Sequence, residues 1–342
     1  MDRPTVAVTM GDPAGIGAEI VVAAYPDLVA AADPVVVGDA DVLREAVAVR
    51  DSDLTVAAVD AVPETVDPET IPVVDLDLVD APPEYGVVRE DYGAASLAFV
   101  ERAAELATDG AVDAIATAPI NKQATRMAGS DYAGHTGLLA DYTDTDAYAM
   151  LLVEGDLRVT HVSTHVPLAE ACDRVTTAAV RETIGVTHEG MRDLGIDDPE
   201  IAVAGLNPHA SDGGLLGTAE ATEIEPAVAD ARADGLDVTG PASPDTVFSQ
   251  AAAGAYDCVV AMYHDQGHIP VKMLGFAGDD AVSGVNVTLG LPIVRTSVDH
   301  GTAFDIAGEG VADPASLVDA VELAAEIASN RTERGELADR TD

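Results

Sequence analysis

Apolar and polar positions along the chain predict strands that alternate with helices. The opening reads as a strand, VAVTM, then a glycine-containing turn, GDPAGIG, and then a helix, AEIVVAAYPDLVAAA. Further strands are predicted at residues 35–38, 112–118, 148–153, 158–163, 201–206 and 256–262. These apolar runs lack a clean two-residue alternation, which is typical of strands buried on both faces. The sequence therefore predicts an α/β protein with mostly parallel sheets covered by helices.

Helical spacing of apolar residues predicts helices at about residues 43–49, 92–108, 174–194, 219–234 and 313–329. In the clearest of these, residues 174–194, Asp173 is the expected N-cap and Gly195 the residue that stops the helix. Residues 284–310 begin like a buried strand that extends to Leu291 and then read as a loop punctuated by glycine. Long polar loops with few charges are typical of binding surfaces, although an ordinary connection is the alternative.

Composition narrows the class of protein. The chain has 342 residues, 48% of them hydrophobic, and its apolar runs fall short of the roughly 20 residues that a membrane helix needs. The N-terminus lacks a signal-peptide pattern, so a cytoplasmic protein is expected. The net charge of −44 would repel nucleic acid and anionic membranes. Because the acids are spread along the chain, we expect a surface suited to a high-salt cytoplasm, with an acidic docking surface as the alternative.

The basic residues point to chemistry. Fifteen of the seventeen are arginine and only Lys122 and Lys272 are lysine. A lysine ammonium is a compact charge that can bind phosphate or lose its proton, whereas a guanidinium keeps its proton. We therefore expect functional roles for both lysines. Cys172 and Cys258 make no disulfide framework or metal motif and are expected to be two buried thiols.

Polar loops that follow the predicted strands form the expected site, as is usual in α/β folds. Six of the eight histidines lie in or next to these loops: His135, His165, His209, His264, His268 and His300. His165, His209 and His264 each follow an apolar strand, and three converging imidazoles would suit Zn²⁺ or another transition metal. Judged from their spacing in the sequence alone, three separate loop histidines are slightly favoured over one shared metal site. His161 and His188 are expected to be structural, and GDPAGIG is either an anion cradle or a tight turn.

Nine motifs occur in order: MGDPAGIG, TAPINK, GHT, THVPL, GLNPHA, PDTVF, MYHDQG, NVTLGLP and RTSVDHGTAFDIAG. Together, over about residues 5–312, they resemble the 4-hydroxythreonine-4-phosphate dehydrogenase family, including paralogues that act on four-carbon sugar-acid phosphates. The segment HGTAFDIAG also resembles isocitrate and isopropylmalate dehydrogenases. The resemblance implies their two-lobed fold with the active site in the cleft between lobes. We expect residues 1–130 with 285–342 as the NAD lobe and residues 131–284 as the metal and dimer lobe.

The resemblance also implies roles for single residues. His165, His209 and His264 would bind the metal, one of them from the other subunit of a homodimer. Substrate would be held by His135, Thr136, Lys272, Asn286 and Arg295, and His300, Gly301 and Thr302 would lie on the NAD side. Lys122, Asp245 and Asp265 are the candidates for catalysis, either as proton carriers or, for the aspartates, as groups that orient the ligands. Zn²⁺ is the expected metal, with Mg²⁺, Co²⁺ or Mn²⁺ as alternatives, and NADP is the alternative to NAD.

The expected reaction is oxidation and decarboxylation of a phosphorylated four-carbon hydroxy acid. We expect 4-(phosphooxy)-threonine, on the route to pyridoxal phosphate, with threonate or erythronate 4-phosphate as the alternative. The chain departs from the family pattern at Gly137, at His268 and in an insertion at residues 276–283. The insertion lies between two expected substrate-binding residues and so bears on the substrate. Two other classes are a phosphate acyltransferase of related fold and a non-catalytic acidic binding protein.

Overall fold

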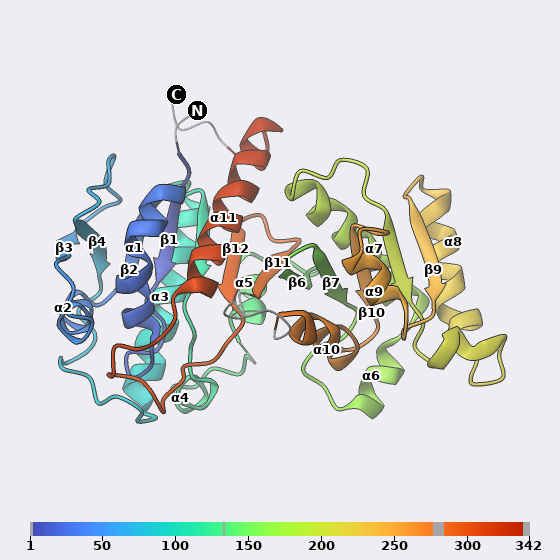
Figure 1. Cartoon of the computed structure of the whole chain (residues 1–342), viewed down its shortest axis with the longest axis horizontal. Helices are drawn as coiled ribbons and strands as arrows, with labels where there is room; N and C mark the ends of the chain where they lie inside the picture. The colour runs from blue at the N-terminus through green and yellow to red at the C-terminus, as the bar shows by residue number, and fades with distance from the viewer. Residues whose placement is uncertain (1–2, 133, 276–283, 338–342) are drawn as a thin grey trace. The chain divides into compact units, whose positions relative to one another are not determined.

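The computed structural model describes residues 3–132, 134–275 and 284–337 (Figure 1). The chain divides into two compact units: residues 1–144 with 291–342, and residues 145–290. The sequence predicted divisions after residues 130 and 284, whereas the two units divide after residues 144 and 290. His135 therefore lies in the first unit and Asn286 in the second, the reverse of the predicted lobes. The predicted insertion at 276–283 lies outside the described residues. The α/β fold is confirmed: each unit is built from a sheet with helices packed against it.

The first unit contains six parallel strands in the order β3-β4-β2-β1-β5-β12. Their bounds are β1 Thr5–Thr9, β2 Asp33–Gly38, β3 Thr55–Val59, β4 Thr70–Asp75, β5 Ala114–Thr117 and β12 Val294–Val298. The helices are α1 Gly17–Ala31, α2 Ala40–Val49, α3 Glu90–Thr108, α4 Lys122–Met127, α5 His135–Tyr142 and α11 Ala315–Glu333. Helix α11 packs on β12, β5 and α1, and α3 packs on β1 and β2. Strand ends and the loops after them therefore sit on a firmly packed sheet.

The second unit contains the strand order β11-β6-β7-β10-β8-β9. Its strands are β6 Ala149–Glu154, β7 Leu157–His161, β8 Ile201–Ala204, β9 Val238–Ala242, β10 Cys258–Ala261 and β11 Val285–Leu289. Strand β6 is antiparallel to both β11 and β7, and β7, β10, β8 and β9 run parallel. The helices are α6 Leu168–Arg174, α7 Thr177–Asp193, the 3₁₀ segment η1 Pro208–Asp212, the π-helix η2 Glu220–Ile224, α8 Glu225–Ala233, α9 Val247–Ala252 and α10 His264–Gly275.

Neighbouring residues of one strand enter different cores in this unit. Val260 packs in the cluster that includes residues of α7 and α8, whereas Val259 packs in the cluster that includes residues of α9 and α10. Successive side chains of a strand point to opposite faces, so both faces of this sheet are covered. That explains why the strand sequences are continuous apolar runs without alternation.

Four local predictions are wrong. Asp173 belongs to α6, and the side chain that caps α7 is Thr176, which accepts a hydrogen bond from the Ala179 amide, because the backbone turns at Val175 between the two helices. Leu291 lies beyond β11, because Gly290 turns the chain with φ +90°. Residues 294–298, expected in a loop, form β12. Cys258 is buried as predicted, but Cys172 on the short helix α6 is exposed.

The described helices do not include a membrane-spanning segment by length and hydropathy.

Candidate active site

Arg295 is the most deeply buried charged group of the candidate site. It lies on β12, is 2% exposed, and its Nη2 donates a 2.7 Å hydrogen bond to Thr117 Oγ1 on the neighbouring strand β5. Burial lowers the pKa of Arg295 to about 9, so the guanidinium keeps its charge at neutral pH. A buried fixed cation held by a hydroxyl is suited to bind a phosphate or carboxylate.

His135 lies in the same unit, at the first position of α5. Its Nε2 is buried and has no hydrogen-bond partner among the described residues. Burial lowers its pKa well below the usual value, and the charges of Arg295 and Lys122 lower it further. His135 is therefore a neutral imidazole beside two cations, and its electrostatic environment favours an anionic ligand.

Lys122 and Thr136 stand at the starts of two short helices of this unit. Lys122 is the first residue of α4, where the side chain of Asn121 caps the helix by accepting hydrogen bonds from the Gln123 and Ala124 amides. Thr136 directly follows His135 in α5. The loops after β5 thus place the TAPINK lysine and the GHT residues in one unit with Arg295.

The loop expected on the NAD side follows β12 and contacts the GDPAGIG turn. Thr302 accepts a 3.1 Å hydrogen bond from the Ile16 amide, and a Cβ at Gly15 would lie 3.0 Å from the Thr302 carbonyl oxygen. A Cβ at Gly17 would lie only 2.1 Å from the Met10 carbonyl oxygen. These close approaches account for the glycines as parts of a tight turn. His300 Nδ1 lies 2.9 Å from the Gly301 carbonyl oxygen in the same loop.

The sequence patterns did not single out Glu19, whose side chain binds the backbone of this loop. Glu19 is fully buried on α1, and its carboxylate accepts hydrogen bonds from the Gly308 and Gly310 amides. These two amides lie 289 and 291 residues after Glu19 in the sequence. The available signal was an acidic residue within the apolar run at the start of the helix, residues 17–24.

Replacing Asp12 with asparagine is expected to remove part of the pH dependence of stability. Burial raises the pKa of Asp12 from 3.8 to about 6, although hydrogen bonds from the Ala14 and Asn121 amides lower it. The folded state then holds a proton that the unfolded chain has lost, so the free energy of unfolding falls as pH rises from about 4 to about 6. Two pKa units correspond to about 3 kcal/mol.

Urea denaturation of both proteins at pH 4.5 and pH 7 measures this effect. D12N is expected to gain stability relative to the wild type at pH 7, by up to about 3 kcal/mol, and little at pH 4.5. Equal changes in the two proteins between these pH values would show that Asp12 ionises normally in the folded state.

Four histidines gather in the second unit. His165 follows β7 and His264 begins α10, and their ring centroids are 5.5 Å apart. His268 stacks on His264 with a centroid distance of 3.6 Å, and His161 lies 4.9 Å from His268. His161 is 3% exposed, and burial lowers its pKa to about 3, so it is a neutral packing residue.

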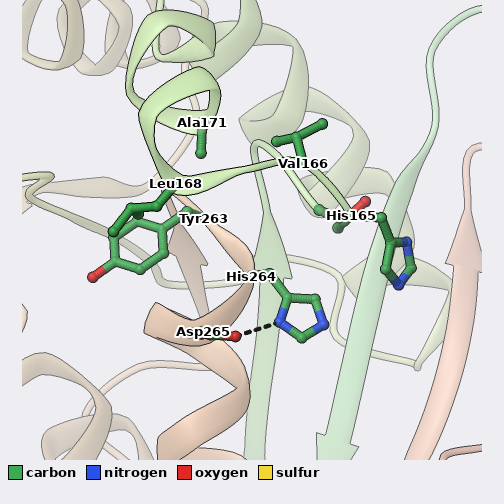
Figure 2. Close-up of a pocket in the computed structure, with 8 residues that line it drawn as sticks. His165, Val166, Leu168, Ala171, Tyr263, His264 and Asp265 are labelled. Atoms are coloured by element: carbon green, nitrogen blue, oxygen red, sulfur yellow. Dashed lines mark hydrogen bonds and ion pairs between the residues drawn. The ribbon is translucent and has the colours of Figure 1, made fainter.

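His165 and His264 line a pocket of about 270 Å³ (Figure 2). Its other lining residues are Thr164, Val166, Leu168, Ala171, Tyr263 and Asp265. His264 Nδ1 lies 2.7 Å from Asp265 Oδ1, as the dashed line in the figure marks. This contact holds the imidazole proton on Nδ1 and leaves Nε2 with a free lone pair, the form of histidine that ligates metals.

His209 stands in η1, in an unusual backbone. Four consecutive residues, His209 to Asp212, have positive φ of 54°, 50°, 65° and 47°. Each costs roughly 1–2 kcal/mol relative to a right-handed turn. The His209 side chain is 65% exposed, and its Nδ1 lies 3.5 Å from Asp245 Oδ2. The Ser243 hydroxyl and, more weakly, His209 lower the pKa of Asp245.

The structure brings His165 and His264 together and leaves His209 apart from them. In the described part of the chain, no three His, Cys, Asp or Glu side chains are grouped so that they could share a metal ion. Lys272 lies on α10, two turns beyond His264, and Asn286 lies on β11 with its Oδ1 buried and without a hydrogen-bond partner among the described atoms.

Comparisons with known proteins agree over nearly the whole chain. The family model for the pyridoxal phosphate biosynthetic protein PdxA matches residues 30–324. A D-threonate 4-phosphate dehydrogenase of Salmonella typhimurium is 48% identical over 96% of this chain and 100% of its own length. A 4-hydroxythreonine-4-phosphate dehydrogenase of Trichlorobacter lovleyi is 45% identical over 96% and 99%. The crystal structure of a 4-hydroxythreonine-4-phosphate dehydrogenase from Klebsiella pneumoniae is 46% identical, with a TM-score of 0.85 over 95% and 98%. The chain therefore belongs to the PdxA family.

Proposed function

We propose that the protein is an NAD-dependent, divalent-metal-requiring dehydrogenase of a phosphorylated four-carbon hydroxy acid. The observation that carries this proposal lies in the first unit, where the positive charges of the buried Arg295 and the exposed Lys122 lower the pKa of His135 and favour an anionic ligand. A phosphorylated acid needs such cations for its phosphate and carboxylate. The names of the relatives support dehydrogenation as the reaction.

We propose D-threonate 4-phosphate as the substrate and 4-(phosphooxy)-threonine as the second candidate. The order reverses that of the sequence analysis. It rests on the relative that is 48% identical over its full length and is named for D-threonate 4-phosphate. The second candidate remains because a relative of nearly equal similarity, 45%, is named for 4-hydroxythreonine 4-phosphate. The substrates differ at one position, where one has a hydroxyl and the other an ammonium group.

His165, His209 and His264 are the proposed metal ligands. The donor set fits a metal ion, because Asp265 holds the His264 proton on Nδ1 and Asp245 lies against Nδ1 of His209. Neutral imidazoles suit Zn²⁺ best among the divalent metals considered. A divalent metal supplies a Lewis acid that lowers the pKa of an alcohol. Asp245 and Asp265 thus orient the ligands in this proposal.

The remaining candidate residues bind the substrate, bind NAD or carry protons. Arg295, His135 and Thr136 hold an anionic group of the substrate, and Lys272 and Asn286 complete its binding. Lys122 is the candidate proton carrier, because an ammonium can lose its proton where a guanidinium cannot. The loop of His300, Gly301 and Thr302 is the proposed NAD site. The products are NADH, CO₂ and a phosphorylated ketone.

We also propose a homodimer in which the partner subunit completes the metal site with one histidine. His209 supports this, because its side chain is 65% exposed on a loop that also carries Leu215, 80% exposed, and Leu216, 48% exposed. Exposed apolar side chains next to a ligand are typical of a surface that is covered in an assembly.

NADH formation from both substrates in parallel tests the proposal. The assay is run in concentrated KCl, which screens the net charge of −44. We expect turnover of D-threonate 4-phosphate that a chelator abolishes and a divalent metal restores. Preferential turnover of 4-(phosphooxy)-threonine would place the enzyme in the other pathway. Failure of folded, metal-supplied protein to oxidise either substrate would refute the proposed reaction.

A further inference from the structure

We propose that Glu220 is a positioning residue that sets the place of His209. Glu220 begins the π-helix η2 and is 1% exposed. Its Oε1 accepts a 2.6 Å hydrogen bond from the Asn207 amide, and its Oε2 accepts a 3.0 Å bond from Asn207 Nδ2. Asn207 stands two residues before His209. The inference rests on the proposed function, because it takes His209 to be a metal ligand.

The loop that carries His209 needs such an anchor. Its left-handed run, His209 to Asp212, is a conformation that non-glycine residues avoid, so neighbouring structure must impose it. Inside the loop, the Ser211 carbonyl accepts hydrogen bonds from the Gly214 and Leu216 amides. These local bonds join parts of the loop to one another but do not attach it to the rest of the unit.

Asn207 binds the Glu220 carboxylate and contacts both ends of the loop. At the start, Glu220 holds its amide and side chain. At the end, Gly217 approaches so closely that a Cβ there would lie 2.7 Å from Asn207 Nδ2. A shift of the Asn207 side chain would therefore move the chain on both sides of His209.

A second contact joins this anchor to the helix of His264. Gln266 on α10 accepts a 2.7 Å hydrogen bond from the Met262 amide and donates a 2.7 Å bond to the Gly205 carbonyl oxygen. Gly205 directly follows β8 and leads into the loop, and a Cβ there would lie 3.3 Å from Glu220 Oε1. The start of the His209 loop is thus held between Glu220 and Gln266.

The contact with Asn207 depends on the negative charge of Glu220. Burial raises its pKa, but hydrogen bonds, led by those from Asn207, together lower it further, and the net pKa lies below the usual value. The ionised group offers two acceptors to the two donors of Asn207. Glutamine has nearly the same shape but would present an NH₂ group to one of those donors. The substitution E220Q therefore removes the charge and one acceptor without creating a cavity, and it breaks the bond from Asn207 Nδ2 unless the Asn207 amide turns over to offer its Oδ1.

Glu223 provides a matched control on the same π-helix. Its Oε2 accepts hydrogen bonds of 2.7 Å from the Thr177 amide and 2.9 Å from Thr177 Oγ1. Both glutamates therefore bind one backbone amide and one side chain of a distant segment. Only the contact of Glu220 leads to His209, whereas that of Glu223 leads to the first residue of α7.

The experiment compares E220Q, E223Q and the wild-type full-length protein in concentrated KCl. Zn²⁺ affinity is measured by competition with a chromophoric chelator, and amide hydrogen exchange is measured over residues 206–217. For E220Q we expect Zn²⁺ affinity to fall by about 10–100-fold, as for other residues that orient ligands, and exchange in the loop to quicken by at least about tenfold. E223Q is expected to keep wild-type values of both. E220D is measured as well, because it keeps the charge but is one methylene shorter, and turning the Asn207 amide cannot restore both bonds to it.

The possible results separate three claims: that Glu220 holds the loop, that it positions His209, and that the protein has the proposed metal centre. Faster exchange with unchanged Zn²⁺ affinity would overturn the positioning of His209, as would equal losses of affinity in E220Q and E223Q. Unchanged exchange in both E220Q and E220D would show that Glu220 does not hold the loop. A wild-type protein that binds no Zn²⁺, with or without a fast loop, would instead overturn the proposed metal centre on which the inference rests.

Discussion

Replacing Arg295 with methionine is expected to lower kcat/KM by about two to four orders of magnitude. Two hydrogen bonds from a buried guanidinium to a substrate anion are together worth roughly 3–6 kcal/mol. The loss should appear mainly in KM if Arg295 binds the substrate and its transition state equally. Methionine has a similar length and no polar atom to leave unsatisfied, so the melting temperature should change little.

Arg50 is the control for this substitution. It is half-buried in the same unit, and its Nη1 donates to the carbonyl oxygens of Gly310 and Ala312 at 2.7 and 3.1 Å. R50M removes an arginine whose Nη1 binds backbone carbonyl groups and should leave KM near the wild-type value. Steady-state kinetics of both variants with D-threonate 4-phosphate would decide, and an R295M enzyme with wild-type KM and kcat would remove Arg295 from the substrate site.

Replacing His264 with alanine is expected to lower kcat/KM by about a thousandfold or more and to weaken Zn²⁺ binding. Stabilisation of a developing alkoxide by a metal is worth several kcal/mol, and each 1.36 kcal/mol is a tenfold change in rate. The variant also loses the imidazole on which His268 stacks, but His264 itself lines the pocket, so the fold should persist. Metal content and kcat/KM of the purified variant measure the effect.

His188 is the matched control. It lies on α7, where its Nδ1 lies 3.2 Å from Glu189 Oε1. H188A should retain wild-type metal content and activity, because its Nδ1 contacts the surface residue Glu189, which is not a candidate ligand. Full activity together with stoichiometric Zn²⁺ in H264A would contradict the proposed ligand set.

Buried apolar strands were predictable because their environment is uniform. The runs that became β5, β8 and β10 are covered on both faces, so nearly every position in them is apolar and no tertiary knowledge is needed to recognise them. Strand β12 escaped recognition because its buried positions include Arg295 and Thr296, whose partners lie elsewhere in the chain. Thr296 Oγ1 donates a 2.7 Å hydrogen bond to the Ala320 carbonyl oxygen on α11.

For helices too, the sequence predicted the helix itself but not the residue that caps it. The helix after residue 174 was evident from its spacing, but its N-cap depended on where the preceding helix α6 stops. Both Asp173 and Thr176 are good capping residues, so residue preference could not choose between them. The direction of the backbone at Val175, set by packing, made Thr176 the cap.

The sequence by itself determined the α/β class, the PdxA family and the set of candidate site residues, because ordered motifs and the scarcity of lysine are properties of the chain. Only the tertiary structure decided how these side chains are held. Glu19, Glu220 and Gln266 bind backbone groups of distant segments, and any residue can supply a backbone amide or carbonyl. Such contacts leave no motif in the sequence, since they depend on where the backbone passes and not on which residue it carries.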